Sequence, residues 1–181
     1  MNKAAFLDRD GVISDDVGHL HKIEDLHLLS GAASAIKKLN DAGYLVLVVT
    51  NQAGIAKGFY TINEMEKLHA EMNVRLGGKG AHIDKIYYCP HHPNGVVSEY
   101  VFACECRKPG TGMIEKAIKE FDIDLEKSFL VGDKASDILA GKRMELKTVF
   151  INGYKGTPEV QYEVMADFFA DDLARAITYF L

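Results

Sequence analysis

Short apolar runs alternate along this chain with longer segments in which apolar residues recur every three or four positions. The first pattern is typical of buried β-strands and the second of amphipathic α-helices. Residues 44–49 are apolar throughout and rich in valine, as expected for a central strand of a parallel sheet. We predict strands at residues 4–7, 44–49, 82–88, 129–132 and 147–151, and a last strand that begins at Phe168 and Phe169.

The helical pattern predicts helices at residues 32–41, 61–76, 112–121, 136–142 and 173–180. Thr61 and Glu64 have the spacing of a capping box at the start of the second helix, and Gly43 is a stop signal after the first. Regular alternation of strands and helices indicates an α/β domain with a parallel sheet covered on both faces. We expect residues 1–181 to form one such domain.

Acidic residues follow the first predicted strand, where ligands bind in parallel α/β sheets. Asp8 and Asp10 are two positions apart, so in extended backbone their carboxylates point the same way, and Gly11 lets the chain turn. One carboxylate can attack phosphorus, and the other can protonate the leaving oxygen and then activate water. Two acids beside a phosphate require a divalent cation, for which Mg²⁺ is the natural choice. Alone, the same residues would fit a solvated turn.

Three further segments follow later strands and fit the same chemistry. Thr50 and Asn51 offer donors to phosphate oxygens, Lys108 can neutralise charge on a transferring phosphoryl group, and Asp133 can complete the magnesium site. Taken singly, these residues also fit polar turns and surface cations. Asp137 fits either a supporting role at the site or a carboxylate that stabilises a helix N-terminus.

The long irregular stretch at residues 89–108 contains all three cysteines of the chain. Three thiolates and one imidazole make a closed, structural zinc site, which gives such a loop a reason to be ordered. We prefer His91 to His92 as the imidazole ligand because it shares register with Cys89. The expected zinc ligands are therefore Cys89, His91, Cys104 and Cys106. The alternative is three unrelated buried cysteines.

Composition narrows the classes of partner. The net charge of −5 argues against nucleic acid as a partner, and 48% apolar with 26% charged residues is typical of a globular protein. No apolar run is long enough to cross a bilayer, and Asp8 interrupts the only apolar stretch near the N-terminus, so we expect a cytoplasmic protein without a membrane partner. Nothing in the pattern demands a dimer, so we expect a monomer.

The order of these motifs resembles the haloacid dehalogenase superfamily of phosphatases. Asp-x-Asp-Gly, Thr-Asn after a strand, a lysine, and Gly-Asp-x-x-x-Asp cover nearly the whole chain. The resemblance implies a Rossmann-like three-layer sandwich without a separate cap domain. It implies Asp8 as nucleophile, Asp10 as general acid and base, and Thr50 and Lys108 as phosphoryl ligands. It also implies that Mg²⁺ binds Asp8, the backbone carbonyl of Asp10, and Asp133.

Within the superfamily, five stretches resemble the D-glycero-D-manno-heptose 1,7-bisphosphate 7-phosphatases. They are Phe-Leu-Asp-Arg-Asp-Gly, Thr-Asn-Gln-Ala-Gly-Ile-Ala-Lys-Gly, Tyr-Tyr-Cys-Pro-His-His-Pro, Cys-Glu-Cys-Arg-Lys-Pro and Val-Gly-Asp-Lys. The resemblance implies hydrolysis of a small sugar bisphosphate in heptose supply for lipopolysaccharide. It implies substrate contacts from Asp16, Val17, Gly18, His19, Thr50, Asn51, Gln52, Ala53, Arg107, Lys108 and Lys134. His19 stands where these enzymes often have tyrosine, so it fits either a sugar contact or a surface loop.

Other functions remain open at this point. The histidinol-phosphate phosphatases share the catalytic and zinc motifs, although their zinc loop is typically shorter, and another small sugar phosphate is a further alternative. Polynucleotide 3′-phosphatases carry Thr-Asn-Gln but lack the zinc loop. A phosphomutase or transferase would share the aspartyl-phosphate step, but no acceptor site is indicated. Outside enzymes, the alternative is a zinc-stabilised protein that binds a phosphorylated ligand without turnover.

Overall fold

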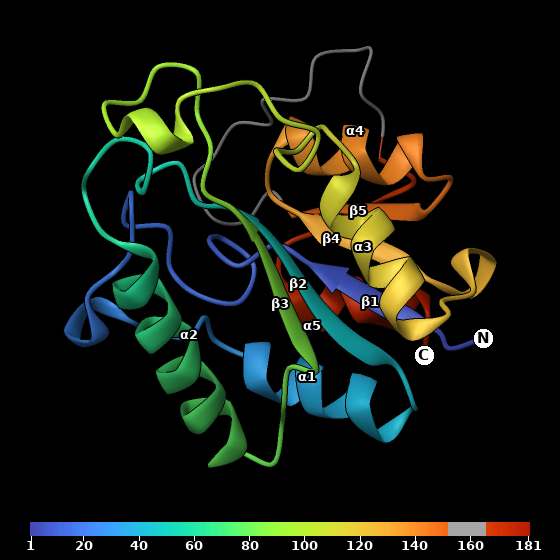
Figure 1. Ribbon diagram of the computed structural model, residues 1–181. Helices are drawn as coiled ribbons and strands as arrows, with labels where there is room; N and C mark the ends of the chain where they lie inside the picture. The colour runs from blue at the N-terminus through green and yellow to red at the C-terminus, as the bar shows by residue number, and fades with distance from the viewer. Residues whose placement is uncertain (152–165) are drawn as a thin grey trace.

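The computed structural model describes residues 1–151 and 166–181, and in them six parallel strands form one sheet (Figure 1). The strand order is β3-β2-β1-β4-β5-β6, so the chain begins at the centre and builds outward in both directions. The strands are β1 Ala4–Leu7, β2 Leu45–Asn51, β3 Lys85–Cys89, β4 Phe129–Gly132, β5 Lys147–Ile151 and β6 Phe168–Ala170. The helices are α1 Ala32–Asp41, α2 Ile62–Gly77, α3 Gly112–Phe121, α4 Ala135–Arg143 and α5 Leu173–Ala176.

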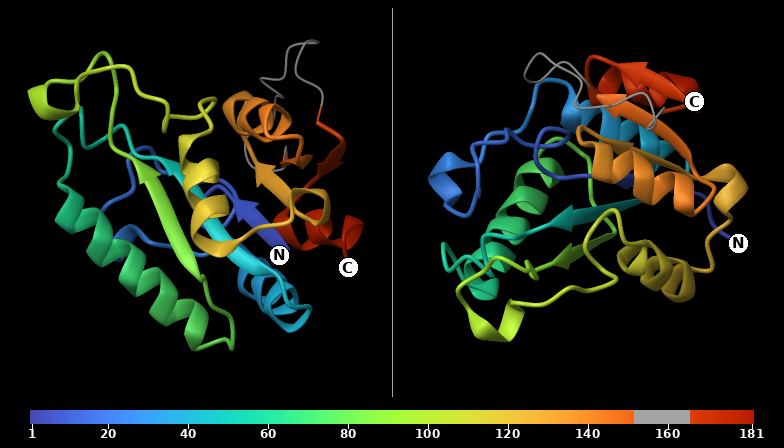
Figure 2. Two further views of the ribbon diagram at one scale, coloured as in Figure 1. Left: turned by 45° about the vertical axis from the view of Figure 1, so that its right-hand side comes forward. Right: turned by 90° about the horizontal axis from the view of Figure 1, so that it is seen from above.

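Helices cover both faces of the sheet, which makes three layers (Figure 2). Alternate residues of β1 point to opposite faces, as the geometry of a strand requires. Ala5 and Leu7 join the core beneath α1, α2 and α5, whereas Ala4 and Phe6 join the core beneath α3 and α4. All four are fully buried, so β1 and the residue that follows it, Asp8, have a fixed position.

The predicted bounds of β1, α1, α3, β4 and β5 are confirmed. The prediction for β3 was wrong at its start, since the strand begins at Lys85 and not at His82. The backbone N–H of His82 donates to Asn40 Oδ1 and that of Ile83 to Asn73 Oδ1, at 3.0 Å in both cases. Asparagine side chains from the two neighbouring helices therefore take the place of a partner strand.

Smaller differences occur at four other elements. Helix α2 begins and ends one residue later than predicted, because Thr61 is its N-cap. The second strand extends to Asn51, because Thr50 and Asn51 still pair with Tyr88 and Cys89 of β3. Helix α4 is longer than predicted by one residue at each end. The closing helix is α5, which tightens into a 3₁₀ turn at Ile177–Tyr179.

The sheet gathers the loops that follow its strands at one edge, toward which the strand arrows point (Figures 1 and 2). The loop after β2 and the long yellow-green segment after β3 lie there together, and backbone hydrogen bonds join them, because Ala56 O accepts from the N–H groups of Val96 and Val97. The residues with candidate chemistry are therefore collected on one side of the molecule. Within the described residues, no helix combines the length and the apolar character that crossing a membrane requires.

The capping box at Thr61 is confirmed and gives a first prediction. Thr61 Oγ1 accepts from the N–H of Glu64, and Glu64 Oε2 accepts from the N–H of Thr61. Thr61→Ala should lower the free energy of unfolding by about 1 kcal/mol, measured by denaturant titration, because the cap is lost. Thr61→Ser keeps the hydroxyl and is the matched control. Equal stability of the two variants would contradict the capping role.

Candidate active site and metal centres

Asp8 and Asp10 lie directly after β1, where the chain turns at Gly11. The N–H of Asp8 still donates to Val131 O on β4, at 3.0 Å, so strand pairing fixes its backbone. Gly11 has a φ of +80°, and a Cβ at this position would lie 2.2 Å from Asp133 Oδ2. Glycine is therefore required for the turn to pass against Asp133, which brings the first and fourth motifs of the sequence together.

Lys108 is the buried cation of the site. Its Nζ lies 3.1 Å from Asp8 Oδ1, 2.5 Å from Asp137 Oδ1 and 2.6 Å from Val49 O. Burial lowers the pKa of Lys108, but the carboxylates of Asp137 and Asp8 outweigh burial and raise it above its ordinary value. Lys108 is therefore a cation, held beside Oδ1 of Asp8.

The amide of Asn51 fixes the backbone of Lys108. Asn51 Nδ2 donates to Lys108 O at 3.0 Å, and Lys108 N donates to Asn51 Oδ1 at 2.9 Å. Both atoms of this amide are thus used within the protein. The position of Asn51 at the end of β2 explains how a lysine distant in the sequence reaches Asp8.

Asp8, Asp133 and Asp137 form a carboxylate cluster that could hold a cation, since each offers an oxygen within 4.8 Å of the others. Asp133 Oδ1 is buried and, among the described residues, accepts no hydrogen bond. Burial and the nearby charge of Asp8 raise the pKa of Asp133 to about 7. Crowded carboxylates with an unsatisfied oxygen are the environment that a divalent cation relieves, and a set of hard oxygen ligands suits Mg²⁺.

The members of this cluster are not equivalent. Asp137 Oδ1 forms an ion pair with Lys108, which holds the ammonium of Lys108 in place. Asp137 Oδ2 accepts the N–H of Lys134 at 3.0 Å, which caps α4. Both interpretations of Asp137 from the sequence therefore apply. The side chain of Asp10 is bound to Arg9, which leaves its backbone carbonyl as the group that it can offer to a metal. Asp8 and Asp133 are the carboxylates best placed for one.

Thr50 and Gln52 form a buried hydrogen-bonded wall next to Asp10. Thr50 Oγ1 accepts a hydrogen bond from Gln52 Nε2 at 2.8 Å, which leaves the hydroxyl proton available for a phosphate oxygen. Gln52 Nε2 also lies 3.4 Å from Asp10 Oδ2, and Gln52 Oε1 accepts from the hydroxyl of Tyr60 at 2.5 Å. Gln52 and Thr50 are buried, so this wall is preorganised.

The segment after the Asp8 turn forms the rim. Asp16 accepts from Lys134 Nζ at 3.2 Å, and Val17 is exposed. His19 packs against Phe59, with ring centroids 4.6 Å apart. Burial and the charge of Lys57 lower the pKa of His19, so its imidazole favours the neutral form. On the opposite side Arg107 Nη1 donates to His91 O, and Ala53 is half-buried.

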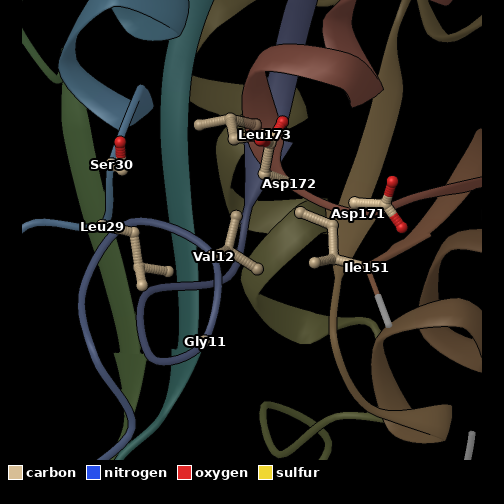
Figure 3. A pocket seen from close by; sticks show the side chains of 8 residues that line it. All are labelled: Gly11, Val12, Leu29, Ser30, Ile151, Asp171, Asp172 and Leu173. Atoms are coloured by element: carbon tan, nitrogen blue, oxygen red, sulfur yellow. The ribbon is translucent and has the colours of Figure 1, made fainter. Parts of the chain in front are cut away.

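A hollow beside the Gly11 turn is shown in Figure 3. Val12 and Ile151 line it, and Asp171 borders it with its carboxylate directed away from the other labelled side chains. Its lining residues are Gly11, Val12, Leu29, Ser30, Ile151, Asp171, Asp172 and Leu173, which include no cation. This hollow therefore does not suit a phosphate.

The three cysteines and His91 meet at a second centre. The Sγ atoms of Cys89, Cys104 and Cys106 are 3.0–3.4 Å apart, and His91 Nδ1 lies 3.2 Å from Cys106 Sγ. All four ligand atoms lie within 4.8 Å of one another, and the cysteines form no disulfide. This set can hold one metal ion by four protein ligands. His92 is not part of it, because its Nδ1 accepts the N–H of Asn94.

Sequence reasoning missed two buried side chains at this site. The sequence analysis assigned no role to His69, which is buried against the fully buried Arg9, with His69 Nε2 3.0 Å from Arg9 Nη1. One signal was present in the sequence. His69 stands on the apolar stripe of α2 beside Met65, Leu68 and Met72, where a polar side chain needs a partner.

The comparisons with known proteins agree with this geometry. A family model described as HAD-hydrolase-like matches residues 105–176. The chain is 48% identical over 149 residues to the D-glycero-alpha-D-manno-heptose-1,7-bisphosphate 7-phosphatase of Photorhabdus laumondii, covering 82% of this chain and 81% of that protein. It is 40% identical over 178 residues to the D-glycero-beta-D-manno-heptose-1,7-bisphosphate 7-phosphatase of Haemophilus ducreyi, covering 98% and 97%.

Among solved structures, the D,D-heptose 1,7-bisphosphate phosphatase of B. bronchiseptica superposes with a TM-score of 0.81 at 28% identity. The match covers 98% of this chain and 97% of that chain, and that protein is complexed with magnesium and phosphate. The similarity thus extends over the whole sheet and over the loops that carry the site.

The carboxylate cluster predicts how magnesium affects stability. The raised pKa of Asp133 means that the folded state keeps a proton that the unfolded state releases between about pH 4 and pH 7, so without metal this group lowers stability as the pH rises through that window. Magnesium should therefore raise the melting temperature more at about pH 7.5 than at about pH 5. At about 100 times the Kd, the stabilisation is about 2.7 kcal/mol.

The matched control is Asp133→Asn, which removes one charge from the cluster with little change in shape. This variant should be more stable than the parent protein without metal at about pH 7.5, and magnesium should shift its melting temperature little. A parent protein whose magnesium shift is the same at both pH values would contradict the assignment of the cluster.

Proposed function

Because the chain belongs to the HAD-like hydrolases, and within them to the D-glycero-D-manno-heptose-1,7-bisphosphate 7-phosphatase family, we propose that it hydrolyses the 7-phosphate of D-glycero-D-manno-heptose 1,7-bisphosphate. It is a phosphoric monoester hydrolase that supplies heptose 1-phosphate for lipopolysaccharide. The observation that carries the proposal is the position of Asp8 at the end of β1, with Lys108 on one side and Asp133 on the other.

Asp8 is the nucleophile in this proposal. One carboxylate oxygen attacks phosphorus, the bond from phosphorus to the sugar oxygen breaks, and an aspartyl-phosphate forms. The hydroxyl of Thr50 and the ammonium of Lys108 bind the phosphoryl oxygens, where charge accumulates during transfer. Mg²⁺, held by Asp8, Asp133 and the backbone carbonyl of Asp10, neutralises phosphoryl and carboxylate charge when it is bound.

Asp10 acts as acid and then as base. In the first half of the reaction it gives a proton to the sugar oxygen that leaves, and in the second half it takes a proton from the water that attacks the aspartyl-phosphate. Burial raises the pKa of Asp10 above its ordinary value, and the guanidinium of Arg9 opposes the rise. A carboxyl between these two influences can hold a proton and release it.

The rim residues bind the rest of the sugar bisphosphate. Asp16 to His19 form one side of the entrance, and Ala53 and Arg107 form the other. Lys134 connects the rim with the centre, because its Nζ contacts Asp16 and lies 3.7 Å from Asp133 Oδ1. Arg107 and Lys134 supply positive charge for an anionic substrate. His19, packed on Phe59, supplies an aromatic wall and not a cation.

The centre formed by the cysteines and His91 holds a structural Zn²⁺ in this proposal. Four protein ligands leave no open position on the ion, so it serves to order the loop. The loop is next to the active site. Cys89 is the last residue of β3 and pairs with Asn51, and Cys106 precedes Lys108 by two residues. Zinc therefore fixes the segment from which Lys108 enters the site. Three cysteines without a disulfide also favour the cytoplasm, and we expect a monomer there.

A panel of phosphate esters tests the function. We expect release of one phosphate from the heptose 1,7-bisphosphate, tried as both anomers, dependent on magnesium and faster than from histidinol phosphate. Asp8→Asn keeps the shape of the site and should reduce turnover below detection. Equal or faster hydrolysis of histidinol phosphate would move the substrate to an amino-alcohol phosphate. A single-turnover assay in which Asp8→Asn and the parent release phosphate equally slowly would favour a binding protein.

The zinc centre is tested by the two neighbouring histidines. The purified parent should contain about one zinc ion per chain by elemental analysis, as four ligands imply. His91→Ala should lower zinc content and make the loop sensitive to protease. The matched control His92→Ala should keep both zinc content and resistance, since the imidazole of His92 hydrogen-bonds only to the N–H of Asn94 in the described part of the chain. The reverse pattern, or a fully folded parent without zinc, would contradict the assignment.

A further inference from the structure

The buried pair His69 and Arg9 has no part in the steps above, although both contact the site. The side chain of Arg9 has no exposed surface, and its guanidinium is surrounded by three partners. Arg9 Nε donates to Asp10 Oδ1 at 2.9 Å and Nη2 donates to Asp10 Oδ2 at 2.8 Å. Nη2 also donates to Leu20 O at 3.2 Å, and Nη1 lies 3.0 Å from His69 Nε2. A buried guanidinium needs this number of acceptors to offset its loss of water.

The direction of the hydrogen bond between Arg9 and His69 follows from chemistry. A guanidinium has only donors, so His69 Nε2 must be the acceptor, and His69 is neutral with its proton on Nδ1. Burial and the charge of Arg9 lower the pKa of His69 to about 3, in agreement with this assignment. Helix α2 therefore presents a neutral acceptor to Arg9 Nη1, the nitrogen of the guanidinium that contacts neither Asp10 nor Leu20.

We propose that His69 is a positioning residue for catalysis: it orients Arg9, and the two-point contact of Arg9 sets the position of the Asp10 carboxyl. This proposal rests on the function proposed above. A single contact would leave the carboxyl free to rotate, whereas the planar guanidinium fixes both oxygens at once. Without His69, Arg9 Nη1 loses the acceptor that the described structure gives it, and the guanidinium turns to find another. Asp10 then loses its fixed position beside the leaving oxygen.

The test compares two substrates that differ in their need for an acid. A sugar phosphate expels an alkoxide, which requires a proton from Asp10, whereas p-nitrophenyl phosphate expels a stable anion. kcat/KM is the suitable quantity because it reports the steps up to formation of the aspartyl-phosphate. A positioned acid contributes about 10²–10⁴-fold, so a displaced one should cost the sugar phosphate about tenfold. The expected result for His69→Leu is therefore a tenfold fall in kcat/KM for the sugar phosphate and little change for p-nitrophenyl phosphate.

Two variants separate positioning from packing. His69→Gln offers a carbonyl oxygen that can accept from Arg9 and should restore most of the loss. Met72→Ala removes a buried side chain one turn further along α2, and it should lower the melting temperature while leaving the ratio of the two kcat/KM values unchanged. Should His69→Leu fail to fold, His69→Met replaces it, because methionine adapts to irregular spaces.

Three outcomes would overturn the proposal. They are an unchanged ratio in a folded His69→Leu or His69→Met protein, an equal loss on both substrates, and no recovery in His69→Gln. The proposed function fails differently, since the parent itself would then not hydrolyse the heptose bisphosphate. In that case an alkyl phosphate that the parent does hydrolyse replaces the sugar phosphate in the comparison with p-nitrophenyl phosphate.

Discussion

The site depends on one buried ammonium group. Lys108 Nζ contacts Asp8, Asp137 and the carbonyl of Val49, with almost no exposure to solvent. A buried lysine without partners would lose its proton, and here the two carboxylates raise the pKa of Lys108 and keep it charged. Asp137 also caps α4, because it accepts the N–H of Lys134, the N-cap residue next to Asp133. The same ion pairs thus join Asp8, the start of α4 and the end of the cysteine loop.

The parallel sheet brings the residues of the site to one edge, and the loops fix the positions of those that no strand carries. The ends of β1, β2 and β4 deliver Asp8, Thr50 and Asp133 to one edge without further help. Lys108 has no strand before it, so its position comes from Asn51 and from the loop in which Cys106 lies two residues away. A long loop would otherwise be too mobile to hold a catalytic cation. A metal held by Cys89, His91, Cys104 and Cys106 would therefore order the segment that carries Lys108.

Local patterns in the sequence predicted most of the fold and the residues at the ends of strands. They succeeded at Thr61, where the cap involves neighbours in sequence, and at the cysteine cluster, where ligand chemistry restricts the choice. They failed at the start of β3, where Asn40 and Asn73 replace a partner strand, because such contacts join distant helices. His69 and Arg9 were missed for the same reason. The role of Asp137 stayed open because helix capping and binding of Lys108 use different oxygens of one carboxylate.

The balance of charge in the site argues for a divalent cation. The carboxylates of Asp8, Asp10, Asp133 and Asp137 are wholly or largely buried. Among the described residues, only Lys108 and Arg9 are buried cations that form ion pairs with them. Lys134 is partly exposed and also faces Asp16. The interior therefore lacks two positive charges, and the raised pKa of Asp133 is the sign of this deficit. A bound Mg²⁺ would supply both charges at once, next to Asp133 Oδ1, a buried oxygen that accepts no hydrogen bond in the described chain.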